Sequence, residues 1–372
     1  MLRKLSSLLF LILALSLLTL PTAPAAAEGI SQALTHYALL VYSTPERISP
    51  IVGVLTPHAE VILEARSADM AWVLGHGTDA NVRGWIESRY LDLAPSTNLS
   101  TLLVSSEVMF VPALAPSTTT YSTINLGAYP IIPINLGRAR QIYEMGRVRG
   151  MNPRTVAKVG DCISDNQYFL SPFGWRKYYL ANYSYLQGVI DYFSASLAQD
   201  SLVAFDGLVT SAALDPMFAN PLACLPGETP LQCEYRVHKP GVAIIMFGAQ
   251  DLLFTSPEQF DLNLRHIVHE TIQAGVVPIL STFPGNLNEW DQSIQYNQIV
   301  VQVALDYQIP LMNLWLALEG LPNHGLSPDG RHPSVPITEA GDLSAANLQR
   351  GYPLRNLVTL QTLDAVWRGA MY

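Results

Sequence analysis

The stretch 158–166, Lys-Val-Gly-Asp-Cys-Ile-Ser-Asp-Asn, constrains the fold more than any other part of the chain. A short apolar segment, 155–159, leads into it and is typical of a buried strand. Ser164 or Asp165 after it can cap a helix. A strand, a glycine turn and a helix start in succession place Cys162 at the carboxyl end of a parallel sheet, where open α/β sheets bind ligands. Because a helix N-terminus favours negative charge, we expect the pKa of the Cys162 thiol to be lowered.

Two later stretches contain residues that can complete a site. Gly-Ala-Gln-Asp at 248–251 closes the apolar run 242–247, and Asp-Gly-Arg-His lies at 329–332. With Gly-Asp-Cys at 160–162, these stretches resemble, in order, the blocks Gly-Asp-Ser, Gly-x-Asn-Asp and Asp-x-x-His of the SGNH (GDSL-type) hydrolases. The resemblance covers roughly residues 126–372. It implies an α/β fold of flavodoxin-like type, with three α/β/α layers around a parallel sheet, and an ester or acyl hydrolase activity.

The resemblance assigns the reacting groups. Cys162 takes the position of the nucleophile, His332 that of the base, and Asp329 that of the residue that fixes the histidine tautomer. His332 precedes Pro333 and could be only a loop histidine, and Asp329 could be a turn residue because Asp-Gly is a turn signal. His324 lies nearby, but its spacing to Asp329 fits no block of the family.

The resemblance also implies the groups that would stabilise an oxyanion. They are the backbone N–H of Cys162, the backbone N–H of Gly207 and the side chain of Gln250. Gly207, in Phe-Asp-Gly at 205–207, is the candidate for the glycine block of the family. Asp161 is expected to brace the turn, and Asp251 to hydrogen-bond loop backbone.

Two residues depart from the family pattern. Cys162 replaces a serine, and a site shaped for a serine oxygen often handles the larger sulfur badly, although cysteine is a good nucleophile. Gln250 replaces an asparagine, which adds a methylene and shifts the amide, and losing one oxyanion donor costs about 10²–10³ in rate. Both changes favour a weak, altered or absent hydrolase activity. Ser164 is the alternative nucleophile, but its place beyond the turn suits a cap better.

The first 27 residues are typical of a secretory signal peptide. Arg3 and Lys4 precede the apolar run 8–20, and small residues end at Ala27, where cleavage is expected. The alternative is an uncleaved membrane anchor, but the run is short for a membrane span. We therefore expect a secreted or cell-envelope protein that has no membrane contact after cleavage.

The charge balance excludes some partners. Removal of 1–27 takes away Arg3 and Lys4 and leaves 19 basic against 30 acidic side chains, a net charge of −11. An acidic chain without a basic run is a poor candidate for binding nucleic acid or anionic lipid. No dinucleotide or phosphate-loop motif is present in the sequence, and we expect no cofactor and no metal.

Three cysteines are present. Cys224 and Cys233 bracket a turn-rich loop, and we interpret them as a disulfide, which an exported chain can form. The alternatives are two free thiols or a metal pair, and the second lacks a zinc-type partner pair. Cys162 is then the odd cysteine, and an odd cysteine in a secreted protein suggests a reactive thiol.

Residues 31–93 are predicted to form a small all-β domain. Short apolar runs alternate there with turns, at 38–42, 51–55, 60–64, 71–74 and 84–86. Gly-Trp-Ile-Glu-Ser-Arg-Tyr-Leu at 84–91 resembles the closing motif of bacterial Src-homology-3-like (SH3-like) barrels, which often bind cell-wall peptide or glycan. Trp72, Trp85 and Tyr90 could line a groove or could be core aromatics of the barrel.

A Ser/Thr/Pro-rich linker is expected over 94–125, with an unassigned strand within 102–112. From 126 onward, helices and strands alternate, which indicates a parallel sheet between helices. The expected helices are 138–149, 178–197, 262–273, 293–307 and 354–371. The expected strands are 155–159, 201–205, 242–247, 276–280 and 309–314.

Three hypotheses follow. The first is a secreted, thiol-dependent hydrolase of an acylated small molecule or glycan, acting in the cell envelope. The second is a catalytically inactive carbohydrate- or cell-wall-binding protein on the same fold. The third is a structural envelope protein with the small barrel as its anchor. Asp329 and His332 favour the first, whereas Cys162 and Gln250 favour the second.

Overall fold

The computed structural model describes residues 31–47, 49–78, 82–109 and 123–372. The predicted signal peptide, 1–27, lies outside these residues. Within the described ranges, none of the helices combines the length and the apolar character that a membrane span requires.

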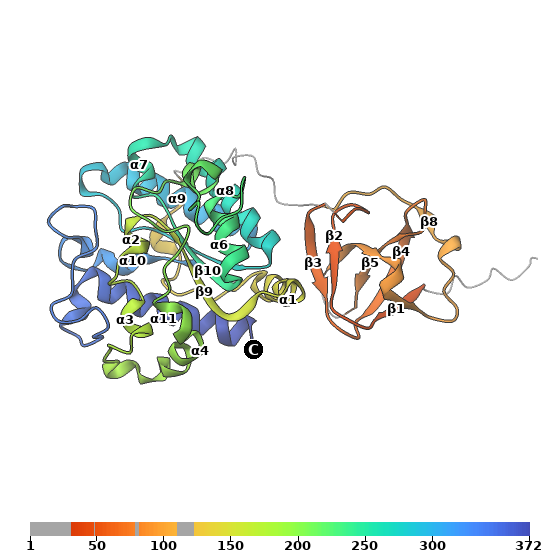
Figure 1. Ribbon diagram of the computed structural model, residues 1–372, viewed down its shortest axis with the longest axis horizontal. Helices are drawn as coiled ribbons and strands as arrows, with labels where there is room; N and C mark the ends of the chain where they lie inside the picture. Colours follow the sequence, from red (N-terminus) through yellow and green to blue (C-terminus); the bar gives the residue numbers. More distant parts are fainter. Residues whose placement is uncertain (1–30, 48, 79–81, 110–122) are drawn as a thin grey trace, which may run out of the picture.

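The N-terminal part is a small β domain, drawn in red and orange in Figure 1. Its strands pair in the order β3-β2-β6-β5-β4-β1-β7, all antiparallel, and β8 adds to β4 in parallel. Each of the five apolar runs predicted from the sequence overlaps a strand. The strands are β1 (Gln32–Thr35), β2 (Leu39–Tyr42), β3 (Ile51–Leu55), β4 (Glu60–Arg66), β5 (Trp72–Gly77), β6 (Arg83–Glu87), β7 (Leu91–Leu93) and β8 (Leu103–Val104).

The aromatic residues of this domain serve mainly as core. Trp85 is fully buried and Trp72 nearly so, whereas Tyr90 is 44% exposed. The indole N–H of Trp85 donates to the carbonyl of Glu107 at 2.7 Å, which satisfies its one polar group. Both tryptophans are therefore core residues of the β domain and do not line an exposed groove.

The chain after β7 continues to pack on the β domain. Arg83 forms ion pairs with Glu64 and Glu107, and the N–H of Met109 donates to the carbonyl of Ser43 at 2.8 Å. The strand left unassigned within 102–112 is thus β8, and it belongs to the N-terminal sheet. The linker expected over 94–125 is correspondingly shorter, and its Pro/Thr-rich part, 110–122, lies outside the described residues.

The second part is built on a parallel sheet in the order β12-β11-β10-β9. Its strands are β9 (Asn152–Gly160), β10 (Pro240–Met246), β11 (Val277–Ser281) and β12 (Leu311–Met312). Every residue of β10 is buried, as a continuous apolar run in the middle of a parallel sheet requires. The strand predicted over 309–314 is short because Asn313 turns its side chain to the N–H of Leu316 and starts the next helix.

No strand forms at 201–205, where one was predicted. The segment makes a single parallel bridge, Gly160 to Ala204. The Ser201 hydroxyl donates to the carbonyl of Lys158 at 2.6 Å, so a side chain makes the contact that a strand backbone would make. The segment still runs alongside the end of β9.

Helices flank the parallel sheet, with α4 and α11 on one side and α6 and α8 on the other in Figure 1. Of the helix predicted over 178–197, only 187–197 is α-helical, after a 3-10 segment at Ala181–Leu186. The longer helices are α1 (Ala139–Arg149), α4 (Gln187–Leu197), α6 (Pro230–His238), α8 (Pro257–Ala274), α9 (Trp290–Tyr307) and α11 (Gly351–Ala370). Short helices are α2 (Cys162–Asp165), α3 (Ser171–Gly174), α5 (Thr210–Ala213), α7 (Asp251–Phe254) and α10 (Leu314–Glu319).

The two parts touch through β3. The side-chain amide of Gln273 accepts from the N–H of Ile51 at 3.0 Å and donates to its carbonyl at 3.3 Å. Arg138 donates to the carbonyl of Val52 at 3.2 Å. Ile51 and Val54 are buried in the same apolar cluster as the core of the α/β part. Polar groups of an edge strand are thus covered by α1 and α8.

Candidate active site

The turn after β9 places Cys162. Gly160 has φ +155°, and a Cβ there would lie 2.2 Å from the carbonyl oxygen of Met246 on β10. Only glycine fits this close approach. Asp161 caps α2, accepting the N–H of Ile163 on Oδ1 at 3.0 Å, so Cys162 is the first residue of the helix. The cap expected at Ser164 or Asp165 is therefore wrong, because both lie within α2.

The side chains of Cys162, His332 and Asp329 lie next to one another, although Cys162 is far from the other two in the sequence. The sulfur lies 3.3 Å from Nε2 of His332, and Nδ1 of His332 lies 2.8 Å from Oδ2 of Asp329. The other oxygen of Asp329 accepts the backbone N–H groups of Arg331 and His332, at 2.9 and 3.0 Å. The loop is closed further by the N–H of Ser327, which donates to the carbonyl of His332.

These contacts fix the histidine tautomer. A carboxylate only accepts, so Nδ1 of His332 carries the proton that is donated to Asp329. Nε2 is then free to accept the S–H proton of Cys162. Asp329 remains ionised: burial opposes the charge, but the hydrogen bonds from Arg331 and His332 outweigh it and lower the pKa of the carboxyl group.

The state of the thiol differs from the expectation. Burial raises the pKa of Cys162 to about 12, with Asp161 and Asp206 adding to the effect and Arg331 opposing it. The backbone N–H of Ile163 at the start of α2 does favour the thiolate, but burial outweighs this effect, so the expected lowering of the pKa is wrong. At neutral pH, Cys162 is a thiol, and it needs a base to become a nucleophile.

Ser164 is not available as an alternative nucleophile. It is buried, and its hydroxyl accepts from Nη2 of Arg355 at 3.1 Å. Arg355 itself is fully buried on α11, donates to the carbonyl of Ile163, and lies 3.5 Å from the ring centre of Phe169. Arg355 thus braces the turn that carries Cys162, and the sequence motifs gave no sign of it.

His324 is also separated from the site. Its ring centre lies 4.5 Å from that of Trp290, with the two planes tilted by 37°, and Nδ1 lies 3.4 Å from Glu319. Asp329 turns to His332 instead.

The loop after β10 brings Gln250 to the same edge. Asp251 is fully buried and accepts both the N–H and the hydroxyl of Thr210, at 3.0 and 2.6 Å. Burial raises its pKa, while the bonds from Thr210, Thr255 and the Gly248 backbone oppose the shift. Asp251 thus ties the Gln250 loop to α5.

Gln250 has a partner that sequence reasoning missed. Its Oε1 accepts from Nη2 of Arg331 at 3.1 Å. Arg331 is the unspecified residue before His332 in the Asp-x-x-His pattern, so the pattern carries no information about it.

Gly207 lies in a turn closed by the N–H of Leu208 and the carbonyl of Phe205. It has φ +77°, and a Cβ there would meet open space. The turn follows the bridge beside β9, which places Gly207 near the edge that carries Cys162.

The predicted disulfide is confirmed. Cys224 and Cys233 are joined, and α6 begins between them with Thr229 and Gln232 forming a capping box. Cys162 is the free cysteine.

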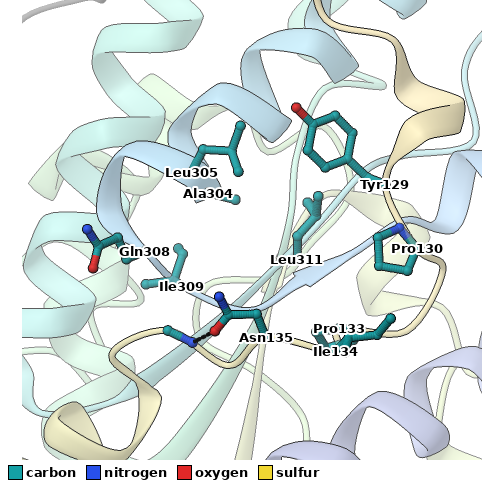
Figure 2. Close-up of a pocket in the computed structure, with 11 residues that line it drawn as sticks. Tyr129, Pro130, Pro133, Ile134, Asn135, Ala304, Leu305, Gln308, Ile309 and Leu311 are labelled. Carbon is teal, nitrogen blue, oxygen red and sulfur yellow. Dashed lines mark hydrogen bonds between the residues drawn. The ribbon is translucent and has the colours of Figure 1, made fainter.

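Figure 2 shows the lining of a cavity of about 320 Å³ that is separate from this site. Ile309 and Leu311 in its wall stand at the amino end of β12, whereas Cys162 follows the carboxyl end of β9, and the strands are parallel. Its lining contains no acid, histidine or cysteine, so we assign it no chemistry. The lining residues are Tyr129, Pro130, Pro133, Ile134, Asn135, Gly137, Ala304, Leu305, Gln308, Ile309 and Leu311.

The structural neighbours of this chain are SGNH and GDSL hydrolases. The psychrotrophic esterase EstA from Pseudoalteromonas sp. is 18% identical with a TM-score of 0.38, covering 58% of this chain and 100% of its own. A lipase/acylhydrolase from Enterococcus faecalis is 18% identical with a TM-score of 0.36, covering 58% of this chain and 96% of its own. The acetylxylan esterase Axe2 from Geobacillus stearothermophilus is 17% identical with a TM-score of 0.35, covering 56% and 93%. No protein-family model and no curated protein matches the chain.

Proposed function

We propose that this protein is an ester (acyl) hydrolase of SGNH type in which Cys162 is the nucleophile, His332 the general base and Asp329 the residue that orients it. One observation carries the proposal: the Cys162 sulfur stands 3.3 Å from a histidine nitrogen whose opposite nitrogen is held by a carboxylate. A nucleophile, a base and an orienter within hydrogen-bond reach are the parts that covalent acyl transfer needs.

The first half of the reaction starts from the neutral thiol. Nε2 of His332 takes the S–H proton as the sulfur attacks the carbonyl carbon of the ester. The electron pair of the C=O bond moves to its oxygen. When the pair returns, the bond to the alcohol breaks, the alcohol takes the proton from His332, and a thioester on Cys162 remains.

The second half restores the enzyme. His332 takes a proton from water, which attacks the thioester carbonyl. The tetrahedral species collapses, the C–S bond breaks, and the sulfur recovers the proton. The sum is one ester and one water converted to one acid and one alcohol. Backbone N–H groups of Cys162 and Gly207, and the Gln250 amide, are the donors proposed for the oxyanion.

The substrate class that fits the proposal is an acyl ester of a small molecule or a glycan. With the signal peptide expected at 1–27, the reaction would take place in the cell envelope or outside the cell, where the Cys224–Cys233 disulfide is stable. The SH3-like β domain would then contact the cell wall. Its partly exposed Tyr90, beside the Arg47–Glu87 ion pair, offers an aromatic surface for such contact.

A second function has one observation in its favour. Because burial raises the pKa of Cys162 to about 12, the nucleophile is held in its less reactive form. A catalytically inactive carbohydrate- or cell-wall-binding protein would tolerate this, and it is the alternative that the assay must separate.

The test is hydrolysis of p-nitrophenyl acetate and butyrate by the purified protein. Cys162→Ala should abolish turnover, and His332→Ala should lower kcat/KM by about 10²–10⁴, the usual contribution of a general base. His324→Ala is the matched control and should leave the rate unchanged, because His324 packs on Trp290 away from the sulfur. Equal rates in wild type and Cys162→Ala would instead favour the binding protein.

A further inference from the structure

Gln250 is held by one end of its side chain. A guanidinium group only donates hydrogen bonds, so the Gln250 atom that faces Nη2 of Arg331 at 3.1 Å is the carbonyl oxygen. The orientation of the amide is therefore determined by its partner. The NH₂ end must point away from Arg331.

That NH₂ end is free to act. Among the residues that the structure describes, the Gln250 Nε2 has no hydrogen-bond partner, and it is not among the buried polar atoms left without one. It is an oriented donor that is not fully buried. Such a donor is what an oxyanion site requires, since it need not reorganise during the reaction.

Arg331 is itself fixed in place. Its backbone N–H donates to Oδ1 of Asp329 at 2.9 Å, and it directly precedes His332. Its Nε is buried without a partner, so the guanidinium is partly enclosed by protein rather than free in solvent. The loop that carries the base thus also carries the group that holds Gln250.

The length of Gln250 matters for this contact. Asparagine is shorter by one C–C bond, about 1.5 Å. From the same backbone position and with Arg331 unmoved, a carbonyl drawn back by that length would lie beyond hydrogen-bond distance of Nη2. The methylene that departs from the family pattern is thus the one that reaches Arg331.

We propose that Arg331 is a positioning residue for the hydrolysis: it holds the Gln250 carbonyl so that the Gln250 amide N–H meets the oxyanion formed on attack by Cys162. This rests on the proposed function. As the S–C bond forms and the C=O pair moves to oxygen, Nε2 of Gln250 donates to that oxygen, and Arg331 keeps its bond to Oε1 throughout. Gln250 is the catalytic residue of the pair, since it would touch the reacting oxygen.

The proposal reverses the expectation from the family. If asparagine were the better donor here, Gln250→Asn would raise activity. If the Arg331 contact positions the amide, Gln250→Asn should lower kcat by roughly 10–100-fold with KM changed less than about twofold. This is at most the lower limit of the 10²–10³ expected for complete loss of a donor, because the amide is displaced and not removed. Arg331→Met should cause a similar loss, and Arg331→Lys should recover part of it.

Two variants separate positioning from folding. Gln250→Glu keeps an acceptor for Arg331 but removes the N–H donor, so it should fold normally and lose at least as much kcat as Gln250→Asn. In a double-mutant cycle, Gln250→Asn should cost less than about threefold once Arg331 is methionine, because the contact is already gone. Additive losses, an unchanged kcat in Arg331→Met, or higher activity in Gln250→Asn would overturn the proposal.

A binding assay keeps this test separate from the fate of the proposed function. The Cys162 thiol can add to the C=O bond of butanal and form a hemithioacetal, whose oxygen would lie where the oxyanion forms. Its affinity is measured by protection of Cys162 from iodoacetamide. Wild type should bind butanal at least about 10-fold more tightly than Arg331→Met or Gln250→Asn does, even if no ester is cleaved. Equal protection in all three proteins would show that Arg331 and Gln250 do not serve this oxygen, whatever the hydrolysis assay gives.

Discussion

The sulfur of Cys162 and Nε2 of His332 lie 3.3 Å apart, although 170 residues separate them in the chain. Cys162 is delivered by the end of β9, and His332 by a loop that is closed by the bridge between Leu326 and Pro333. Asp329 on the same loop sets the tautomer that leaves Nε2 free. The pair can exchange a proton, which the thiol needs because it is not ionised at neutral pH.

The pH dependence of Cys162 alkylation tests the state of the thiol. Burial raises its pKa to about 12, so the thiolate fraction should still be rising at pH 10. The rate of alkylation by iodoacetamide should therefore keep increasing with pH up to pH 10, with no plateau. The same protein unfolded in guanidinium supplies the control, with a midpoint near the free-cysteine value of about 8.5. A plateau below pH 9 in the folded protein would mean that the thiolate is stabilised after all.

Asp161 should make the protein less stable as the pH rises. Burial raises its folded-state pKa from 3.8 to about 6, and its Oδ2 has no hydrogen-bond partner among the described residues. The folded state then binds more protons than the unfolded state between these pH values, so the free energy of unfolding falls as pH rises through this window. Two pKa units correspond to about 3 kcal/mol.

Asp161→Asn keeps the cap to Ile163 and removes the titration. At pH 8 it should be more stable than wild type by on the order of 1–3 kcal/mol, and at pH 4 the difference should be small. Urea unfolding at both pH values measures this. A difference that is equal at the two pH values would show that folding does not raise the pKa of Asp161.

The disulfide should stabilise the fold without taking part in the chemistry. It closes a loop with a sequence separation of 9, and such a loop contributes about 2–3 kcal/mol. Replacement of Cys224 and Cys233 by serine should lower the free energy of unfolding by this amount and leave kcat within about twofold. A large loss of activity in a variant that is still fully folded would show that the disulfide contributes to the active site.

Limited proteolysis tests the proposed division into an N-terminal β domain and an α/β domain. The Pro/Thr-rich composition within 94–125 predicts cleavage there. Because Gln273 binds both polar groups of the Ile51 backbone, the two fragments should stay together on gel filtration. Gln273→Ala should weaken this association. Cleavage within 155–330 instead would contradict the division.

The ordered motifs and the alternation of helices and strands could be predicted from the sequence because both are local features. The tight turn at position 160 requires glycine whatever the rest of the fold is. Parallel strands bring their carboxyl ends to one edge of the sheet, so residues that follow such strands are expected to lie together. The residues it missed act across the fold. Arg355 reaches the turn from α11, and Arg331 reaches Gln250 from a position that the motif leaves open.

The state of Cys162 could not be predicted for a related reason. A helix start is visible in the sequence, but its length of four residues and the burial of the sulfur are not. Burial opposes the thiolate and outweighs the dipole. The absent strand at 201–205 has a similar origin, since only the fold shows that a Ser201 hydroxyl takes the place of a backbone bond.

The central claim, that Cys162 carries the acyl group, is tested most directly by intact-protein mass spectrometry during turnover. Wild type mixed with p-nitrophenyl butyrate and quenched in acid should show one added butyryl group, mapped to the peptide that contains Cys162 and released by hydroxylamine. Cys162→Ala should show none and His332→Ala should accumulate it far more slowly. Turnover without an adduct on Cys162, or an adduct on another residue in wild type and Cys162→Ala alike, would contradict the account.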